Sequence, residues 1–242
     1  MPESRGAGPA WLVLPTYNEA ENLEPVIAAA LANLPQSARV LVVDDNSPDG
    51  TGDLADRLAV AEPRIEVLHR ARKEGVGPAY VAGFRHALAA GAARILEMDS
   101  DFSHDPADLP RLLAATEEAD VALGSRYVSG GGVENWSKVR QAISRGGSVY
   151  ARAVLSLPVR DLTGGFKCFR REVLEAIDLD AIGSRGYAFQ VEMTYRAIQL
   201  GFDVKEVPIT FHERRAGASK MSRSIVAEAA WRVPRMRWGR EG

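Results

Sequence analysis

The 242-residue sequence contains one cysteine, Cys168. A single cysteine cannot form an internal disulfide, and it cannot supply the several thiolates of a structural zinc site. A reducing, cytoplasmic compartment is therefore the expectation. The sequence also lacks any uncharged apolar run near the ~20 residues that a membrane-spanning helix requires, so we expect the protein not to cross a bilayer.

Neither sign of charge dominates the composition. The 30 basic and 32 acidic residues leave a formal net charge of −2, which argues against a general nucleic-acid binder. Apolar residues make up 46% of the chain, enough for a sizeable core. Arginine and lysine are nevertheless denser after Arg126 and again after Arg214, so the local clusters remain of interest.

The first nine residues are rich in glycine, proline and serine and lack the apolar core of a signal peptide. We expect residues 1–9 to form a disordered tail. The rest of the sequence predicts one catalytic domain over residues 10–217 and a C-terminal amphipathic helix and tail over residues 218–242.

Short apolar runs alternate with helix-like segments along this domain. Buried strands are expected at 11–15, 39–45, 65–69, 94–98, 121–124 and 204–209, with a turn into a further strand at 164–169. Helices are expected at 19–34, after Thr51, and at 75–90, 106–119, 137–157, 187–200 and 219–238, the last interrupted at Pro234. This order predicts an α/β fold with a Rossmann-like, mostly parallel sheet covered by helices on both faces.

Two carboxylates, Asp99 and Asp101, follow the apolar run that ends at Met98. The carboxyl ends of parallel strands are where open α/β sheets bind ligands. Adjacent carboxylates repel each other unless a cation neutralises them, and Mg²⁺ or Mn²⁺ prefers such oxygen ligands while leaving positions for substrate phosphates. This segment therefore predicts a metal–diphosphate site and a nucleotide-dependent transferase.

Polar residues also follow the first two expected strands. The first runs into Pro15-Thr16-Tyr17-Asn18-Glu19, without the glycine-rich fingerprint of a dinucleotide-binding unit. Asn18 is expected to cap the next helix, while Tyr17 and Glu19 can still face a base or ribose. The second strand ends in Asp44-Asp45, which are either solvated turn acids or acceptors for a nucleobase or ribose.

Glycines and basic residues complete the candidate site. Gly75 and Gly77 open a helix and permit close approach of the backbone to a ligand. Arg126, Arg214 and Lys220 lie in loops after two separate strands, where they suit phosphate groups better than a solvated basic face. Neutral imidazole is a poor ligand for a hard cation, so His104 is expected to support the acidic pair from behind or to cap a helix.

In this combination and order, the motifs resemble family 2 glycosyltransferases with the GT-A fold. More narrowly, the sequence resembles the branch of dolichol-phosphate mannosyltransferases and polyprenol monophosphomannose synthases. The segments that carry the resemblance are 15–19, 43–51, 98–101, 124–127, 161–166 and 214–221. It extends over roughly residues 10 to 225.

The resemblance implies a role for each matching residue. The guanosine of the donor would be held by Pro15, Tyr17, Glu19, Val43 and Asp45. Mg²⁺ or Mn²⁺ on the diphosphate would be held by Asp99 and Asp101, with Ser100 lining the site and Ser103 reaching the metal directly or through water. Donor diphosphate or acceptor phosphate would be met by Arg126, Arg214 and Lys220, which with Asp101 form the expected catalytic set.

The implied reaction is the inverting transfer of mannose from GDP-mannose to a polyprenyl phosphate at a membrane surface. The alternative is a family 2 transferase that uses another sugar nucleotide, such as UDP-glucose, or another acceptor. A binding subunit without turnover is disfavoured by the intact acidic pair, and a nucleotidyltransferase by the missing glycine-rich loop. The resemblance also allows a membrane-anchoring partner protein.

The C-terminal segment 221–238 mixes tryptophans and other apolar residues with arginines. Such a helix either lies at the membrane interface or packs on the sheet, and its sequence fits both. The expected location is cytoplasmic with peripheral association to the membrane.

Overall fold

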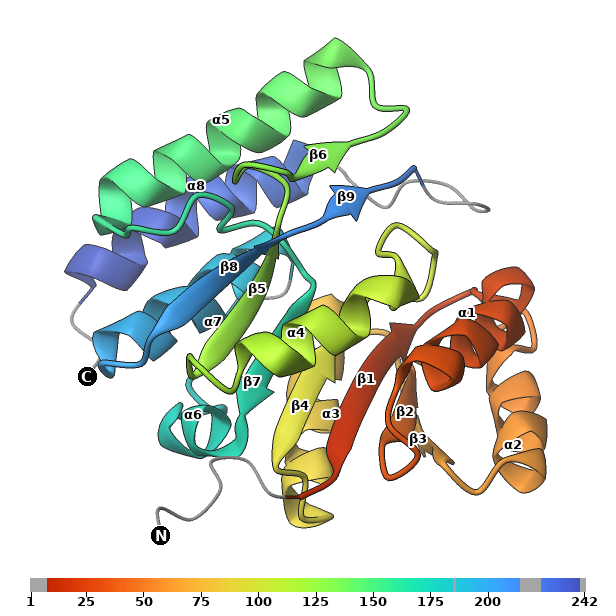
Figure 1. The fold of residues 1–242 in the computed structure, drawn as a ribbon. Coiled ribbons are helices and arrows are strands. Elements are labelled where there is room, and N and C mark those ends of the chain that lie inside the picture. Colours follow the sequence, from red (N-terminus) through yellow and green to blue (C-terminus); the bar gives the residue numbers. More distant parts are fainter. Residues whose placement is uncertain (1–7, 185, 214–222, 240–242) are drawn as a thin grey trace, which may run out of the picture.

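Figure 1 shows the computed structural model, which describes residues 8–184, 186–213 and 223–239. The strands are β1 (Ala10–Thr16), β2 (Arg39–Asp44), β3 (Ile65–His69), β4 (Arg94–Glu97), β5 (Val121–Ser125), β6 (Gly132–Val133), β7 (Lys167–Arg170), β8 (Val204–Pro208) and β9 (Thr210–Phe211). The helices are α1 (Ala20–Asn33), α2 (Thr51–Ala61), α3 (Val76–Ala89), η1 (Pro106–Asp108), α4 (Leu109–Ala115), α5 (Lys138–Leu155), α6 (Arg171–Ala176), α7 (Tyr187–Gln199) and α8 (Arg223–Trp238).

Seven strands form the main sheet in the order β3-β2-β1-β4-β7-β5-β8. All neighbouring pairs are parallel except those of β7, which runs antiparallel to both β4 and β5. The prediction of a mostly parallel sheet is confirmed. Because β1, β2, β4 and β5 point the same way, the loops that follow them meet at one edge of the sheet.

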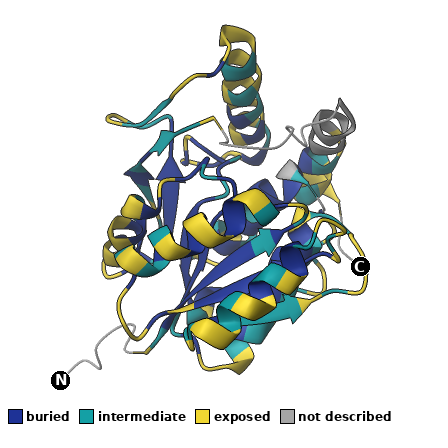
Figure 2. Cartoon of the chain, turned by 90° about the vertical axis from the view of Figure 1, so that its right-hand side faces the viewer, coloured by how far each residue is buried: buried dark blue, intermediate teal, exposed yellow. Residues whose placement is uncertain are grey.

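Successive side chains of each strand face opposite sides of the sheet, and both sides are covered. Leu12 and Leu14 of β1 pack with α1, α2 and α4, whereas Trp11 and Val13 pack with α3, α6 and α7. Figure 2 shows the strands in dark blue between helices whose outer faces are yellow. Cys168 lies in this core, where burial raises the pKa of its thiol to about 12 and leaves it neutral.

Several predicted helix boundaries are wrong. The segment expected as one helix over 106–119 is the short η1 turn followed by α4, although Asp105 caps its start by accepting from the Ala107 amide at 2.9 Å. Asn18 does not cap a helix, because its backbone is in the left-handed region, and the helix expected after Thr51 begins at Thr51 itself. Pro234 does not interrupt α8, which runs to Trp238.

The two-stranded pairing of β6 with β9 and the short helix α6 have no counterpart in the sequence prediction. The β6–β9 pair forms a separate two-stranded sheet below α5, and α5 and α8 lie alongside each other (Figure 1). In α8, Val233 is buried among residues of α5 and α7, while Trp231 is 62% exposed. Within the described parts of the chain, no helix has both the length and the apolar character needed to span a membrane.

Candidate active site

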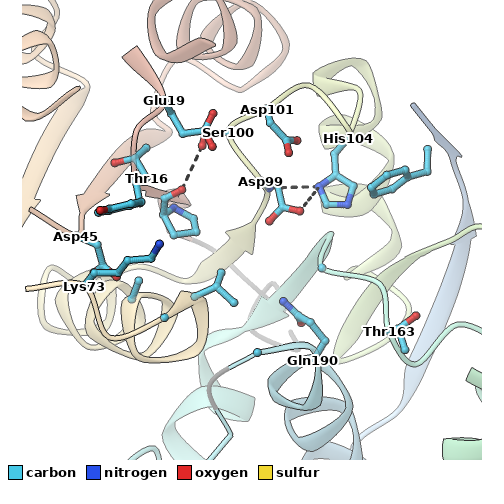
Figure 3. Close-up of a pocket in the computed structure, with 18 of the residues that line it drawn as sticks. Thr16, Glu19, Asp45, Lys73, Asp99, Ser100, Asp101, His104, Thr163 and Gln190 are labelled. Atoms are coloured by element: carbon cyan, nitrogen blue, oxygen red, sulfur yellow. Dashed lines mark hydrogen bonds and ion pairs between the residues drawn. The ribbon is translucent and has the colours of Figure 1, made fainter. Parts of the chain in front are cut away.

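A cavity of about 220 Å³ opens where β1, β2, β4 and β5 end. Figure 3 shows Asp45 and Lys73 on one side of it, Thr163 on the other, and Asp99 between them. The cavity is lined by Pro15, Thr16, Tyr17, Glu19, Asp45, Lys73, Gly75, Val76, Ala79, Asp99, Ser100, Asp101, His104, Arg126, Trp136, Ser144, Thr163, Gly165, Gly186, Gln190 and Phe211.

Most of the site residues that the sequence predicts are brought together here. Those lining the cavity are Pro15, Tyr17, Glu19, Asp45, Asp99, Ser100, Asp101 and Arg126. The side chain of Val43 lies in the core instead, fully buried beside α3, and Ser103 lies behind the cavity wall. Arg214 and Lys220 lie outside the described residues.

The two acids after β2 have different surroundings. Asp44 accepts hydrogen bonds from the Ser47 amide at 3.1 Å and the Ser47 hydroxyl at 2.5 Å, so it closes the turn. Asp45 faces the cavity, where Arg70 pairs with its carboxylate and the Glu74 amide donates to it at 3.3 Å. Of the two, Asp45 is therefore the one placed to meet a ligand, with its orientation set by Arg70.

The turn at 46–51 holds the start of α1 in place. The Asp49 carboxylate accepts from the Ala20 amide at 3.2 Å, and the Thr51 hydroxyl accepts from the Glu19 amide at 3.0 Å. These bonds satisfy N–H groups that a helix leaves open at its first turn. The turn thus fixes Glu19 and the neighbouring Tyr17 at the cavity, and the Nζ of Lys73 lies 3.7 Å from the Tyr17 ring centre.

Asp99 and Asp101 reach the cavity from the loop after β4. Asp101 is buried, and its Oδ1 accepts from the Ser103 amide at 3.0 Å. The Asp99 side chain is 40% exposed and accepts from the Tyr80 hydroxyl at 3.4 Å. Phe102, directly after Asp101, takes a left-handed φ of 61°, which tightens the loop around Asp101. Ser100 ties the loop to β1 through its hydroxyl, which donates to the Pro15 carbonyl at 3.2 Å.

His104 supports this loop as a neutral ring. Burial lowers the pKa of its imidazole to about 3, and the ring stacks on Phe166 with centres 4.9 Å apart. Its Nδ1 accepts from the Asp99 amide at 3.2 Å, so the proton of the neutral ring is on Nε2 (Figure 3). The position agrees with the expected supporting role behind the acidic pair.

Ser103 contributes its backbone to the acidic pair. Its hydroxyl is buried and has no hydrogen-bond partner among the described residues. The bond to Asp101 comes from its amide rather than its side chain. A buried hydroxyl without a partner costs free energy, so its position next to Asp101 suits an additional oxygen ligand or water.

Arg126 lies at the far side of the cavity, where hydrogen bonds and aromatic rings surround its guanidinium group. Its Nε donates to Asp161 at 2.7 Å, and its Nη2 donates to Asp161 at 2.6 Å and to Thr163 at 2.8 Å. The rings of Trp136 and Phe211 lie within 5.7 Å and 5.3 Å of the guanidinium carbon. Arg126 is thus a rigid cation whose charge is already shared with Asp161.

Replacing Asp161 with asparagine tests this pairing. Burial by itself would raise the pKa of Asp161, but the Arg126 charge and its hydrogen bonds hold the pKa below 3.8. The pairing therefore adds stability above pH 3.8 that is lost as the pH falls through the lower, folded-state pKa. We expect Asp161→Asn to lower the free energy of unfolding by about 1.5–3 kcal/mol at pH 7, and by less at pH 3. Urea unfolding at both pH values measures this, and an equal loss at both would contradict it.

The oxygen donors at the cavity fit a hard divalent cation. Among the described residues, no group of three or more histidine, cysteine or acidic side chains forms a closed metal cage. Two carboxylates with an open cavity beside them suit Mg²⁺ or Mn²⁺, which are often held by one or two protein carboxylates together with substrate phosphates. Asp99, Asp101 and the buried hydroxyl of Ser103 are the residues that fit such an ion.

Sequence reasoning missed Lys73, Thr163 and Gln190, which all line the cavity. Lys73 lies just before the glycine loop that the sequence analysis identified, so the same reasoning could have included it as a site residue. Gln190 lies inside a helical segment and gives no local signal. Of the two loop glycines, Gly75 lines the cavity, whereas a Cβ at Gly77 would lie 2.6 Å from the Ser184 carbonyl; Gly77 is needed for packing rather than for a ligand.

Comparison with known proteins assigns this chain to a family. The model of "Glycosyl transferase family 2" matches residues 11–178. The chain belongs to glycosyl transferase family 2. Two curated proteins are similar over nearly all of the chain. The polyprenol monophosphomannose synthase of Mycolicibacterium smegmatis is 50% identical, over 96% of this chain and 87% of its own. The undecaprenyl-phosphate mannosyltransferase of Micrococcus luteus is 52% identical, over 94% and 92%.

Solved structures support the GT-A fold of this family 2 member. Glucosyl-3-phosphoglycerate synthase from Mycobacterium tuberculosis, in complex with Mn²⁺, UDP and glucosyl-3-phosphoglycerate, superposes with a TM-score of 0.66. It is 18% identical, and the match covers 94% of this chain and 78% of that one. A complex of the same enzyme with Mg²⁺ and UDP gives a TM-score of 0.65 at 18% identity, with 94% and 77% covered. The expected GT-A fold is confirmed.

Proposed function

We propose that this protein transfers mannose from GDP-mannose to a polyprenyl phosphate, with inversion at the anomeric carbon. One observation carries the proposal: a single cavity joins residues after β1 and β2 to the acidic pair after β4 and to Arg126 after β5. The chain is also about half identical to two enzymes named a polyprenol monophosphomannose synthase and an undecaprenyl-phosphate mannosyltransferase. We further propose that residues 10–217 form the catalytic unit and residues 218–242 a helical extension.

The two ends of the cavity suit the two halves of a sugar nucleotide. At one end, Tyr17, Glu19 and Asp45 offer a ring face and acceptor oxygens for a base and ribose, and Pro15 offers backbone. Val43 can help only by shaping β2, because its side chain lies in the core. In the middle, Asp99 and Asp101 lie where a diphosphate would follow, with Ser100 and Ser103 securing their loop.

Mg²⁺ or Mn²⁺ bound there would withdraw charge from the leaving diphosphate. The remaining stabilisation of charge comes from side chains of the protein itself. Its rigid cation, Arg126, stabilises charge without having to reorganise, and Arg214 and Lys220 are proposed to meet the remaining phosphate oxygens. The acceptor is a phosphate monoester with a second pKa of about 6, so it is already ionised at neutral pH. The enzyme therefore needs no strong general base.

A donor and acceptor panel tests the proposed function. The protein is incubated with GDP-mannose, GDP-glucose or UDP-glucose, each with a polyprenyl phosphate in detergent, and the released nucleotide and the glycolipid are measured. We expect transfer from GDP-mannose with release of GDP. Transfer only from UDP-glucose would replace the donor assignment while keeping the reaction class. No transfer from any of these donors, with release of pyrophosphate from GTP and mannose 1-phosphate in a separate sample, would instead indicate a nucleotidyltransferase.

A lipid acceptor also requires contact with a membrane surface, and α5 has a face suited to it. Val139, Ile143 and Tyr150 recur at helical spacing and are 69%, 51% and 39% exposed. Exposed arginines at 145 and 152 flank these apolar side chains. Apolar and basic residues combined in this way are typical of helices that lie in the membrane interface. We propose peripheral binding through α5 and the neighbouring α8, with or without an anchoring partner protein.

The α5 contribution gives a testable prediction. We expect Val139→Glu combined with Ile143→Glu to weaken binding to phosphatidylglycerol-containing vesicles about tenfold or more, because two apolar contacts are lost and two charges must be buried. Vesicle co-sedimentation measures this. Val60→Glu is the matched control, since Val60 is 89% exposed on the distant α2. Equal binding by the α5 variant and the control would contradict the role of this face.

A further inference from the structure

The middle of the cavity contains an amide that neither the motifs nor the acidic pair explain. Gln190 projects from the first turn of α7, lines the cavity and is only 5% exposed. Figure 3 shows its side chain reaching toward Asp99 from the opposite wall, between the Lys73 end and the Thr163 end. A buried amide in this place is costly unless its hydrogen bonds are made, so its orientation and partners decide what it does.

A buried ion pair fixes the orientation of this amide. The Lys167 ammonium, fully buried in β7, donates to Glu97 at 2.9 Å and to the Oε1 of Gln190. An ammonium group can only donate, so it must be faced by the amide oxygen and never by the amide NH₂. The amide nitrogen of Gln190 is therefore directed away from Lys167. Glu97 accepts a hydrogen bond from the amide NH₂ of Gln190 as well, and so completes a buried cluster beneath the cavity floor. The amide nitrogen carries two hydrogens, so the second one can face the cavity.

The wall beside the amide nitrogen is open because it is built from glycine. A Cβ on Gly165 would lie 3.1 Å from the Nε2 of Gln190, closer than ordinary van der Waals contact. Gly165 itself lines the cavity, so its missing side chain leaves space next to the amide. The site thus presents a fixed N–H donor to whatever occupies the middle of the cavity.

We infer that Gln190 donates a hydrogen bond to one hydroxyl of the sugar being transferred, and that Lys167 is the positioning residue that keeps this donor directed at it. The inference rests on the proposed function. In that reaction the sugar lies between the donor diphosphate at Asp99 and Asp101 and the incoming acceptor phosphate, which is the part of the cavity that Gln190 borders. A directed donor rejects sugars that lack an acceptor at that position, because the amide would then be left unpaired.

The test compares GDP-mannose with its single-deoxy analogues at C2, C3, C4 and C6 in the wild-type protein and two variants. Gln190→Glu keeps the shape and an oxygen for Lys167 but removes the N–H donor. Gln190→Met keeps the volume and removes both polar atoms. We expect the wild type to prefer GDP-mannose over one deoxy analogue by about 10- to 100-fold in kcat/KM. In both variants this preference should fall toward one, because only the rate with GDP-mannose decreases.

The matched control is Gln199→Met, an exposed glutamine at the end of the same helix, which should keep the wild-type preference. Thermal unfolding shows that each variant is folded. Equal losses on all donors, or an unchanged preference in both Gln190 variants, would overturn the inference while leaving mannose transfer intact. If the wild type does not use GDP-mannose at all, the proposed function fails instead, and deoxy analogues of the sugar it does transfer apply the same test to Gln190.

Discussion

Replacing Asp101 with asparagine is expected to lower the rate of sugar transfer by about 10²–10³-fold, the usual effect of losing one preorganised charge-stabilising group. Asp101 is the more buried member of the acidic pair, and the Ser103 amide holds its carboxylate toward the cavity. Asparagine preserves the shape of the side chain and removes its negative charge. The loss should therefore appear in the chemical step and in the dependence on Mg²⁺ or Mn²⁺, while folding is retained.

Single-turnover kinetics over a range of metal concentrations measures this effect. Asp105→Asn is the control on the same loop, because Asp105 caps the following turn and asparagine caps equally well. We expect this control to keep the wild-type rate and metal dependence. If Asp101→Asn transferred sugar as fast as the control, the acidic pair would not be the centre of the site.

Replacing Lys167 with methionine is expected to lower the free energy of unfolding by about 3–5 kcal/mol. Lys167 and Glu97 form an ion pair in which both side chains are fully buried. Burial raises the pKa of Glu97 and lowers that of Lys167, so each charge depends on its partner. Removing the ammonium leaves a buried carboxylate unpaired. The deficit should shrink as the pH is lowered, because Glu97 can then be protonated in the folded state.

The double variant Glu97→Gln with Lys167→Met distinguishes the ion pair from general packing damage. Replacing a whole buried pair with neutral side chains is often nearly neutral, so we expect most of the stability to return. Lys205→Met is the matched control on β8, where Lys205 pairs with the exposed Glu118. The loss of stability in this control should be much smaller than in Lys167→Met, because an exposed ion pair contributes little. A double variant as unstable as Lys167→Met would contradict the unpaired-charge explanation, and urea unfolding decides between the two.

Much of the fold follows from local sequence patterns. The apolar runs at 11–15, 39–45 and 65–69 are strands of the sheet because both of its faces are covered, which requires continuous apolar residues. The direction of β7 was beyond such reasoning, since a strand has the same side-chain pattern when parallel or antiparallel. The β6–β9 pairing likewise joins residues about 78 positions apart and has no local signature.

The residues of the candidate site were likewise predictable only in part. Asp99, Asp101 and Asp45 were predictable because they come directly after apolar strands whose carboxyl ends share an edge. Whether an acid faces the ligand or closes a turn was not predictable, since this depends on contacts such as those of Asp44 with Ser47. Gln190 and its partner Lys167 were missed because their roles arise only when β4, β7 and α7 are packed together.

The central claim is that the cavity transfers mannose from GDP-mannose to a lipid phosphate with the help of a divalent cation. The most direct test gives the purified protein radiolabelled GDP-mannose and polyprenyl phosphate in detergent, with Mg²⁺ or Mn²⁺ in one sample and a chelator in the other. We expect labelled lipid and GDP in equal amounts with the metal and neither with the chelator. Lipid formed equally well with the chelator would contradict the metal site, and no labelled lipid in either sample would contradict the proposed function.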